Sequence, residues 1–130
     1  MKSQIGEMAW LDLSIDNAEE VSEFYQNVIG WQVQQVSMGD YSDYAMVSAI
    51  SGEPVAGVCH AKGPNKDLPP SWLPYFLVED IEKAIAQVKD SGGTLVTELK
   101  SMGSDKYVVI KDPAGAVCAI YQKGNGKSSA

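Results

Sequence analysis

Asp12 is the residue whose type and position most clearly suggest chemistry. It lies within the alternating segment Met8–Ile15, between Leu11 and Leu13. If this carboxyl group faces inward, desolvation raises its pKa and makes it a candidate general base. Two other roles remain open, namely a structural hydrogen bond to a tyrosine or backbone group and simple exposure to solvent. Asp12 is therefore the candidate catalytic residue, with both alternatives kept.

Cys59 and His60 are adjacent and could be taken for a thiol–imidazole pair. Neighbouring residues of a strand point to opposite faces, however, so we expect no such pair. His60 is the only histidine and adjoins a proline-rich segment, which favours a surface or rim position. By the same alternation, the side chains of Cys59 and Cys118 should point to opposite faces of the sheet. Because a disulfide needs Cβ atoms about 3.8 Å apart, we expect two free thiols.

The composition excludes several classes of protein. Seventeen acidic against ten basic residues give a net charge of -7, which disfavours binding to nucleic acid and to anionic membranes. No apolar run approaches the roughly 20 residues of a membrane span. No signal-peptide core is visible, so we expect a cytoplasmic protein. The chain also lacks a glycine-rich nucleotide fingerprint, a Gly-x-Ser-x-Gly elbow and a Cys-x-x-Cys pair.

The elements that position these residues repeat along the chain. Each half is expected to run strand, helix and three strands. The first helix is capped by Asn17 and ends at Gly30, and the second is capped by Asp80 and ends at Gly92-Gly93. The expected strands cover residues 8–15, 31–38, 44–50, 55–60, 72–78, 94–100, 107–111 and 116–122.

This internal repeat predicts the fold. Each repeat has about 55 residues, which is too few for an independent core, so the two halves should share one sheet. We predict an α+β fold in which two tandem βαβββ modules form one curved, mostly antiparallel eight-stranded sheet, a cup with the helices outside. An α+β sandwich with a coincidental repeat is the alternative. The single domain 1–130 would comprise module one at 5–61, a linker at 62–70, module two at 71–123 and a flexible tail at 124–130.

Short motifs at fixed places in both halves add to this pattern. They are Trp10-Leu-Asp-Leu, Phe24-Tyr25, Gly30-Trp31, Pro54-Val-Ala-Gly57, Trp72-Leu-Pro-Tyr75, Val78-Glu-Asp80, Gly92-Gly93 and Asp112-Pro-Ala-Gly-Ala116. With them the chain resembles the glyoxalase / bleomycin-resistance / extradiol-dioxygenase superfamily, also called vicinal oxygen chelate proteins, over residues 5–122. It looks most like a glyoxalase-like subgroup whose role is poorly defined. The resemblance also implies a homodimer.

The same resemblance points to four positions for metal ligands, one on the first and one on the last strand of each half. Metal-dependent members carry His, Gln or Glu there. The matching positions in this chain are Trp10, Gly57, Leu73 and Ala119. None of these side chains can ligate a divalent metal. We therefore expect no metal and no other cofactor, and we do not expect metal-dependent glyoxalase or dioxygenase activity.

The cavity side of the cup should instead bind a ligand directly. Strand alternation and the family register place a mostly apolar and aromatic set on that face. The candidate ligand-binding residues are Trp10, Asp12, Ser14, Gly57, Cys59, Leu73, Tyr75, Leu77, Tyr107, Ala119 and Tyr121, with Val109 and Val117 beside them. The alternative is that these side chains simply pack against one another as a core.

Three functions are therefore open. The first is a metal-free protein that binds a small, largely apolar or aromatic molecule. The second is a metal-independent lyase or isomerase that uses Asp12 or a pocket tyrosine. The third is an accessory or regulatory protein with a filled cavity. The partners expected are a small molecule and a second copy of the chain, with no nucleic acid and no membrane.

The absence of donors at the four mapped positions gives a first prediction. Protein purified without chelator and soaked with Ni, Zn, Mn and Fe should retain far less than one equivalent of any of them, as measured by elemental analysis. A shift of one residue in the mapping brings in only Cys118 as a donor, which would act alone. Stoichiometric retained metal, or loss of a demonstrated activity on chelation, would contradict the prediction.

Overall fold

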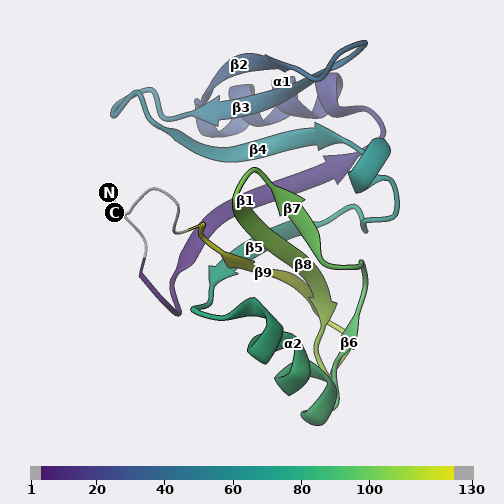
Figure 1. Ribbon diagram of the computed structural model, residues 1–130. Coiled ribbons are helices and arrows are strands. Elements are labelled where there is room, and N and C mark those ends of the chain that lie inside the picture. Colours follow the sequence, from purple (N-terminus) through teal and green to yellow (C-terminus); the bar gives the residue numbers. More distant parts are fainter. Residues whose placement is uncertain (1–3, 125–130) are drawn as a thin grey trace. The chain divides into compact units, whose positions relative to one another are not determined.

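The computed structural model describes residues 4–124, which form two helices and nine strands (Figure 1). Helix α1 covers Ala18–Ile29 and α2 covers Ile81–Asp90. A short 3-10 turn, Gly63–Asn65, lies in the expected linker. The strands are β1 (Met8–Ile15), β2 (Gln32–Ser37), β3 (Ser42–Val47), β4 (Pro54–His60), β5 (Trp72–Leu77), β6 (Thr94–Leu95), β7 (Lys100–Met102), β8 (Asp105–Lys111) and β9 (Val117–Gln122).

The chain divides into two compact units. The N-terminal unit is Trp10–Trp72, and the C-terminal unit combines the residues up to Ala9 with those from Leu73 onward. Within the C-terminal unit, the segment before β1 pairs with the end of β5: the Gly6 amide donates to the Leu77 carbonyl at 2.8 Å. The element order repeats as strand, helix and further strands. The predicted α+β class built on tandem βαβββ modules is confirmed.

The strands of the N-terminal unit lie in the order β2-β3-β4-β1. Neighbouring β2, β3 and β4 are antiparallel, whereas β1 pairs in parallel with β4. The parallel register aligns Asp12 with Gly57 and Ser14 with Cys59. Paired residues of a parallel ladder point to the same face. This pairing therefore decides which side chains of β1 and β4 can meet.

The C-terminal unit repeats this arrangement with the order β5-β9-β8-β6, and β7 also pairs with β8. Here too the first strand pairs in parallel with the last, and the register aligns Tyr75 with Ala119 and Leu77 with Tyr121. The other pairs are antiparallel. The repetition of the parallel first-to-last pairing shows that both halves use the same local topology.

The expectation of eight strands is wrong by one, because the segment predicted as one strand over 94–100 is two short strands, β6 and β7. Between them, the amides of Val96 and Thr97 both donate to the Val109 carbonyl, at 2.8 and 3.3 Å. Two donors on one acceptor interrupt the regular ladder. The Thr97 hydroxyl also accepts a hydrogen bond from the Val109 amide at 3.2 Å, and the strand breaks there.

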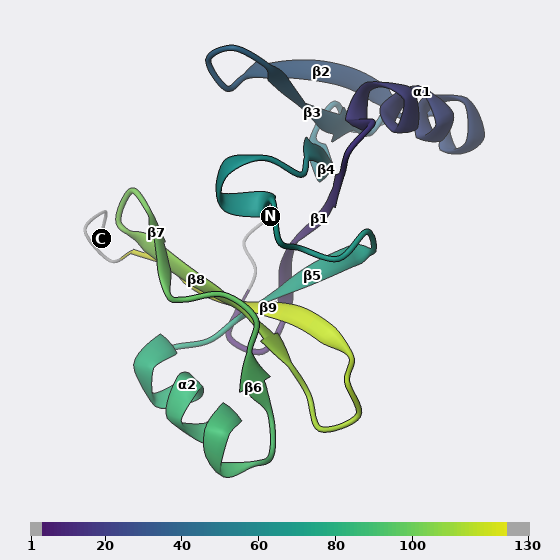
Figure 2. The same cartoon turned by 90° about the vertical axis from the view of Figure 1, so that its right-hand side faces the viewer.

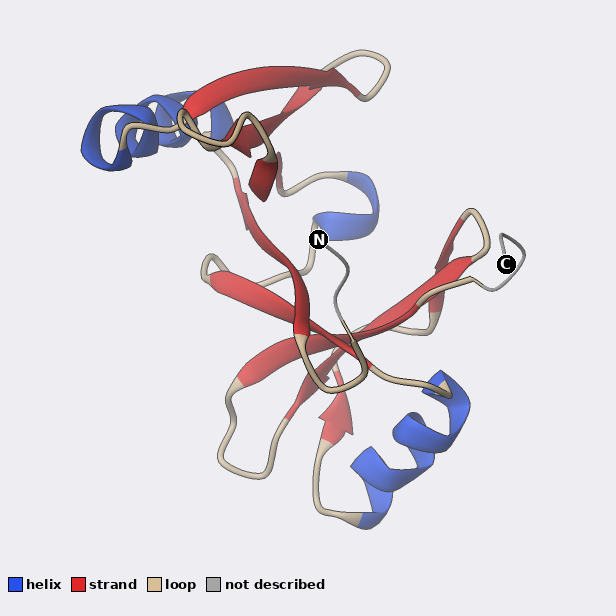
Figure 3. Cartoon of the chain, turned by 90° about the vertical axis from the view of Figure 1, so that its left-hand side faces the viewer, coloured by secondary structure: helices blue, strands red, loops and turns tan. Residues whose placement is uncertain are grey.

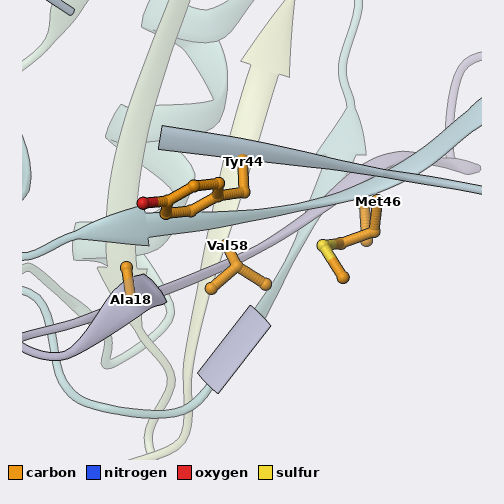
Figure 4. Packing of buried hydrophobic residues seen from close by; sticks show 5 residues of the cluster. Ala18, Tyr44, Met46 and Val58 are labelled. Atoms are coloured by element: carbon orange, nitrogen blue, oxygen red, sulfur yellow. The ribbon is translucent and has the colours of Figure 1, made fainter. Parts of the chain in front are cut away.

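Helix α1 packs on the strands of its own unit. The buried cluster contains Ala18 of α1 together with Tyr44, Met46, Ala56 and Val58 of β3 and β4. Figure 4 shows four of these side chains close together. All five are at most 9% exposed. The helix therefore covers the face of the sheet opposite to Asp12 and Gly57.

Helix α2 covers the corresponding face of the C-terminal unit (Figures 2 and 3). Ile81 at its start is buried with Val108 of β8 and Ile120 of β9. Ile85 packs against the same cluster. Each helix thus lies on one face of its own sheet and leaves the other face to the predicted ligand-binding residues.

The helix ends agree with the sequence except at one cap. Gly30 adopts the left-handed conformation, with φ of 89°, and ends α1 as predicted. The Asp80 side chain accepts hydrogen bonds from the amides of Glu82 and Lys83, both at 3.1 Å. Asn17 makes no such bond, because its φ and ψ of -107° and 59° differ from the extended conformation of an N-cap. Its amide group donates instead to the Glu20 carboxylate at 3.2 Å.

Two remaining expectations concern the ends of the chain and the membrane. The predicted flexible tail falls, beyond Gly124, outside the described residues. Neither helix of the described part has the length and hydropathy needed to cross a bilayer.

The two helix starts give a matched prediction. Asp80→Ala should lower the free energy of unfolding by about 1 kcal/mol, because it removes the acceptor of two first-turn amides. Asn17→Ala should cost only a few tenths of a kcal/mol, since no capping bond is lost. Urea unfolding followed by far-UV circular dichroism compares the two. Equal losses would show that the Asn17 side chain caps α1 in solution.

Candidate functional site

The candidate site begins on β1, where Trp10, Asp12 and Ser14 point to one face of the sheet. The ladder to β4 places Gly57 beside Asp12 and Cys59 beside Ser14 on that same face. Ser14 is buried, whereas Trp10, Asp12 and Cys59 are half-buried. The five predicted residues of the N-terminal unit are therefore neighbours.

The closest contact in this group joins Asp12, Trp10 and Gly57. The Trp10 indole N–H donates to Oδ1 of Asp12 at 2.5 Å. The same oxygen lies against the Cα of Gly57, and any Cβ added there would clash with it. Trp10 Nε1 would lie 3.5 Å from that Cβ. Glycine at position 57 thus makes the space that the carboxylate occupies.

The environment of Asp12 raises the pKa of its carboxyl group from 3.8 to about 6. Burial is the main cause, and repulsion from the Asp43 carboxylate adds to it, while the Trp10 hydrogen bond acts in the opposite direction. A carboxyl group with this pKa exchanges its proton close to neutral pH. It can act as a hydrogen-bond acceptor or as a general base.

Asp43 of β3 is a member of this site that sequence analysis missed, because the expected strand began only at residue 44, whereas β3 begins at Ser42. It is only 7% exposed. Its carboxylate accepts the backbone amide of His60 at 2.8 Å. The available signal was the alternation of Asp43 and Ala45 with Tyr44 and Met46, which places Asp43 on the face opposite to the core.

Cys59 lies between the two carboxylates and is a poor nucleophile. Burial raises the pKa of its thiol well above the usual range, and the charges of Asp12 and Asp43 raise it further, as does the hydrogen bond to Asp43. The thiolate, not the thiol, is the reactive form. Both Cys59 and Cys118 are free thiols.

His60 lies at the end of β4, in keeping with a rim position, but it is less exposed than a surface residue. Its side chain is only 16% exposed, and Nδ1 lies 3.5 Å from the Asp43 carboxylate. Nδ1 is buried without a hydrogen-bond partner. The Tyr41 ring meets the imidazole edge-on, with centroids 5.5 Å apart. His60 is thus packed among aromatic rings at the end of β4.

The other predicted ligand-binding residues share one face of the C-terminal unit. The registers of β5, β8 and β9 align Tyr75 with Ala119 and align Leu77 and Tyr107 with Tyr121. The rings of Tyr75 and Tyr107 lie 5.9 Å apart. Four of these residues are at most 7% exposed, namely Leu73, Tyr75, Leu77 and Ala119.

Tyr121 is the polar centre of this second group. Its hydroxyl donates a short hydrogen bond to the Asp105 carboxylate, which also accepts the Gly124 amide at 2.6 Å. Burial and the neighbouring Asp105 raise the pKa of Tyr121 to about 12. Tyr121 is therefore a neutral hydrogen-bond donor and not a base at neutral pH.

The residues present at the mapped metal positions do not fit a metal ion. Trp10 offers an indole N–H that is already bonded to Asp12, and Gly57, Leu73 and Ala119 offer no donor atom. Over residues 4–124, no three His, Cys, Asp or Glu side chains are grouped as a metal site.

A separate groove lies at the start of α2 in the C-terminal unit. Its volume is about 410 Å³, and its lining is polar and charged: Glu79, Asp80, Glu82, Lys83, Lys106 and Gln122. It contains none of the predicted ligand-binding residues. Since binding sites for small apolar molecules are lined mainly by apolar groups, this groove does not match the ligand class expected from the sequence.

The sequence profile of the Glyoxalase/Bleomycin resistance protein/Dioxygenase superfamily matches residues 7–120. The chain belongs to this superfamily. Its curated relatives include the anthracycline biosynthesis protein DnrV of Streptomyces peucetius, 30% identical over 92% of this chain and 48% of DnrV. The putative glyoxylase CFP32 of Mycobacterium tuberculosis is 24% identical over 87% of this chain and 44% of CFP32. The chain thus spans about half the length of these relatives.

Solved structures of the superfamily share the fold. A glyoxalase/bleomycin resistance protein/dioxygenase superfamily member from Vibrio splendidus aligns with a TM-score of 0.58 at 19% identity, over 88% of this chain and 97% of that one. A methylmalonyl-CoA epimerase in complex with methylmalonyl-CoA aligns with a TM-score of 0.58 at 12% identity, over 92% and 96%. At these identities the likeness concerns the fold alone.

The raised pKa of Asp12 predicts how stability depends on pH. The unfolded carboxyl group titrates near 3.8 and the folded one near 6. The folded state therefore holds more protons between these values, and the free energy of unfolding should fall as the pH rises through this window. Asp12→Asn removes this titration and should stabilise the protein at pH 7 by about 3 kcal/mol.

The measurement is urea unfolding of both proteins at a series of pH values. The two curves should converge below about pH 3, where Asp12 is neutral in both states. If Asp12→Asn instead lowers stability at pH 7 by about 1–3 kcal/mol, the carboxylate is needed as the structural partner of Trp10.

Proposed function

We propose that this superfamily member binds a small, largely apolar or aromatic molecule without a catalytic metal. The ligand would lie against the face of the N-terminal unit that carries Trp10 and Asp12. The observation that carries this proposal is the Asp12 carboxyl group: it is half-buried, has a pKa of about 6 and lies over Gly57 with one oxygen held by the Trp10 indole.

The geometry of Asp12 favours a ligand that donates a hydrogen bond. Oδ1 is used by Trp10, which fixes the orientation of the carboxyl group. Oδ2 is available to accept an O–H or N–H of a bound molecule. The Trp10 ring beside it offers an aromatic surface on which a flat ligand could pack. A planar molecule that carries a hydroxyl group fits both features.

The relatives support the same class of ligand. DnrV is named as an anthracycline biosynthesis protein, and anthracyclines contain flat, fused rings that carry hydroxyl groups. The superfamily name itself includes bleomycin resistance proteins. A hydroxylated aromatic ligand for this chain is therefore in keeping with both its chemistry and its relatives.

A second candidate function is metal-independent proton transfer by Asp12. A base with a pKa near the working pH is well suited to remove a proton from a bound substrate. Cys59 and Tyr121 are not alternatives, since the pKa of each is raised and both are neutral at pH 7. In this function, Asp12 would take the proton and return it to a different atom, as in an isomerisation.

The test is a titration with 1,4-dihydroxyanthraquinone, followed by quenching of tryptophan fluorescence at pH 7. Trp10→Phe should abolish most of the quenching, because Trp10 is the tryptophan on the site face. Asp12→Asn should weaken binding about five- to tenfold, since a hydrogen bond to a charged acceptor becomes one to a neutral acceptor. For the wild type, affinity should fall below about pH 6 as Asp12 is protonated.

Trp31→Phe is the matched control. Trp31 packs with Tyr25 and Trp72 in the helix-side cluster, with 6.2 Å between the Trp31 and Tyr25 centroids. Its replacement should leave the affinity unchanged. Absence of saturable binding by the folded wild type, or equal losses in the two tryptophan variants, would reject a site at Trp10 and Asp12.

A further inference from the structure

Helix α1 exposes large apolar side chains that a solvent-facing helix would ordinarily not carry. Phe24 is 55% exposed, Val28 63% and Ile29 51%. Phe24 and Val28 are four residues apart and lie on one side of the helix. An exposed group of this kind, bordered by polar residues, is typical of an interaction surface.

This apolar group rests on a fixed aromatic base. The Phe24 ring meets Tyr25 edge-on with centroids 5.0 Å apart. Tyr25 in turn packs edge-on against Trp72 at 5.2 Å and accepts a hydrogen bond from its indole N–H at 3.2 Å. Trp31 lies 6.3 Å from Trp72. Because these rings hold one another, Phe24 is presented without a large loss of side-chain entropy on binding.

The second helix of the chain provides an internal comparison. In α2, whose residues Ile81–Asp90 are all described, no large apolar side chain is exposed. Its solvent side carries Lys83 and Lys89, and Lys89 lies in the last turn, where a cation interacts favourably with the helix dipole. Helix α1 has no basic residue anywhere. The exposed apolar group is therefore a feature of α1 and not of the repeated module.

The charge around α1 is acidic only. The chain has no lysine or arginine between Lys2 and Lys62, although this segment contains nine acidic residues. On α1 itself, Glu19, Glu20 and Glu23 are exposed. The N-terminal unit carries nine acidic residues and two lysines, so it accounts for the whole net charge of -7, while the rest of the chain has eight of each. This surface therefore favours a cationic partner.

We propose that α1 docks a basic, amphipathic segment of another protein. Leucine-like side chains of that segment would cover Phe24 and Val28, and its lysines or arginines would face Glu20 and Glu23. The carbonyl groups of the last turn of α1, which carry partial negative charge, would add to the attraction. This mode of binding places the apolar stripe of one helix against an apolar surface of another.

A second copy of this chain is a poorer occupant of the α1 surface. Two copies that met through α1 would bring Glu19, Glu20 and Glu23 of each close to those of the other, and like charges at an interface disfavour association. A basic segment buries the same apolar side chains and also neutralises the carboxylates. The negative charge of the α1 surface thus favours a basic segment over a second copy of this chain.

The test uses a fluorescein-labelled peptide of about 18 residues, with leucines at i, i+3, i+4 and i+7 spacing and lysines elsewhere. Fluorescence anisotropy with the full chain should show saturable binding that weakens as the salt concentration rises to about 0.5 M. A peptide with glutamates in place of the lysines, and one with the same composition but no apolar face, should bind at least about tenfold more weakly.

Variants of the protein locate the surface. Phe24→Ser with Val28→Ser should weaken binding of the basic peptide at least about tenfold, which corresponds to loss of the apolar contact. Glu20→Gln with Glu23→Gln should weaken it about threefold and reduce its salt dependence. Far-UV circular dichroism of each variant verifies that the chain is folded.

Two control variants remove the same kinds of side chain elsewhere. Ile50→Ser removes an apolar side chain that is 96% exposed in the same unit, and Glu82→Gln removes an exposed acid from α2. Both should leave the affinity unchanged. Equal binding of the acidic peptide, or an equal loss in a control variant, would overturn the proposal. So would sedimentation showing that Phe24→Ser with Val28→Ser converts a dimer into a monomer, because a second copy would then be the occupant.

Discussion

The contact between the Asp12 carboxylate and the backbone of Gly57 is the constraint on which the N-terminal unit depends. The parallel ladder between β1 and β4 places these residues side by side. Any side chain at position 57 would meet Oδ1 of Asp12. The carboxyl group can therefore keep its present orientation, bonded to Trp10, only because residue 57 has no Cβ. The Trp10 indole then stabilises the charged form with a hydrogen bond.

This arrangement has an energetic cost that suggests a function. Burial and the Asp43 charge disfavour ionisation of Asp12, and the pKa of about 6 expresses that penalty. A purely structural position would be served as well by asparagine, which accepts the same indole hydrogen bond without a charge. Groups whose pKa is displaced by their surroundings occur frequently at binding and catalytic sites. The displaced pKa of Asp12 therefore makes the face that carries it the strongest candidate for a functional surface in this chain.

The two modules share a topology but have diverged in chemistry. Each pairs its first strand with its last in parallel and covers one sheet face with a helix. The N-terminal unit holds the buried Asp43, the half-buried Asp12 and the whole net negative charge. The C-terminal unit has no net charge and holds the hydrogen-bonded Tyr121–Asp105 pair. The two units thus share a backbone topology but differ in surface chemistry. The exposed apolar side chains of α1 belong to the acidic N-terminal unit.

The sequence by itself determined the elements, the repeat and the superfamily. Apolar spacing set the strands and helices, and residues such as Gly30 and Asp80 set helix ends, because these are local properties of the backbone. Alternation also sorted Trp10, Asp12 and Ser14 onto one face. Only the tertiary structure decided what those side chains meet, since strand register aligns residues far apart in the chain. It brought Asp43 beside His60 and Cys59, placed Asp12 over Gly57, and broke the strand near Thr97. Hydrogen bonds and charge repulsion between distant residues fix these features, and no local pattern encodes them.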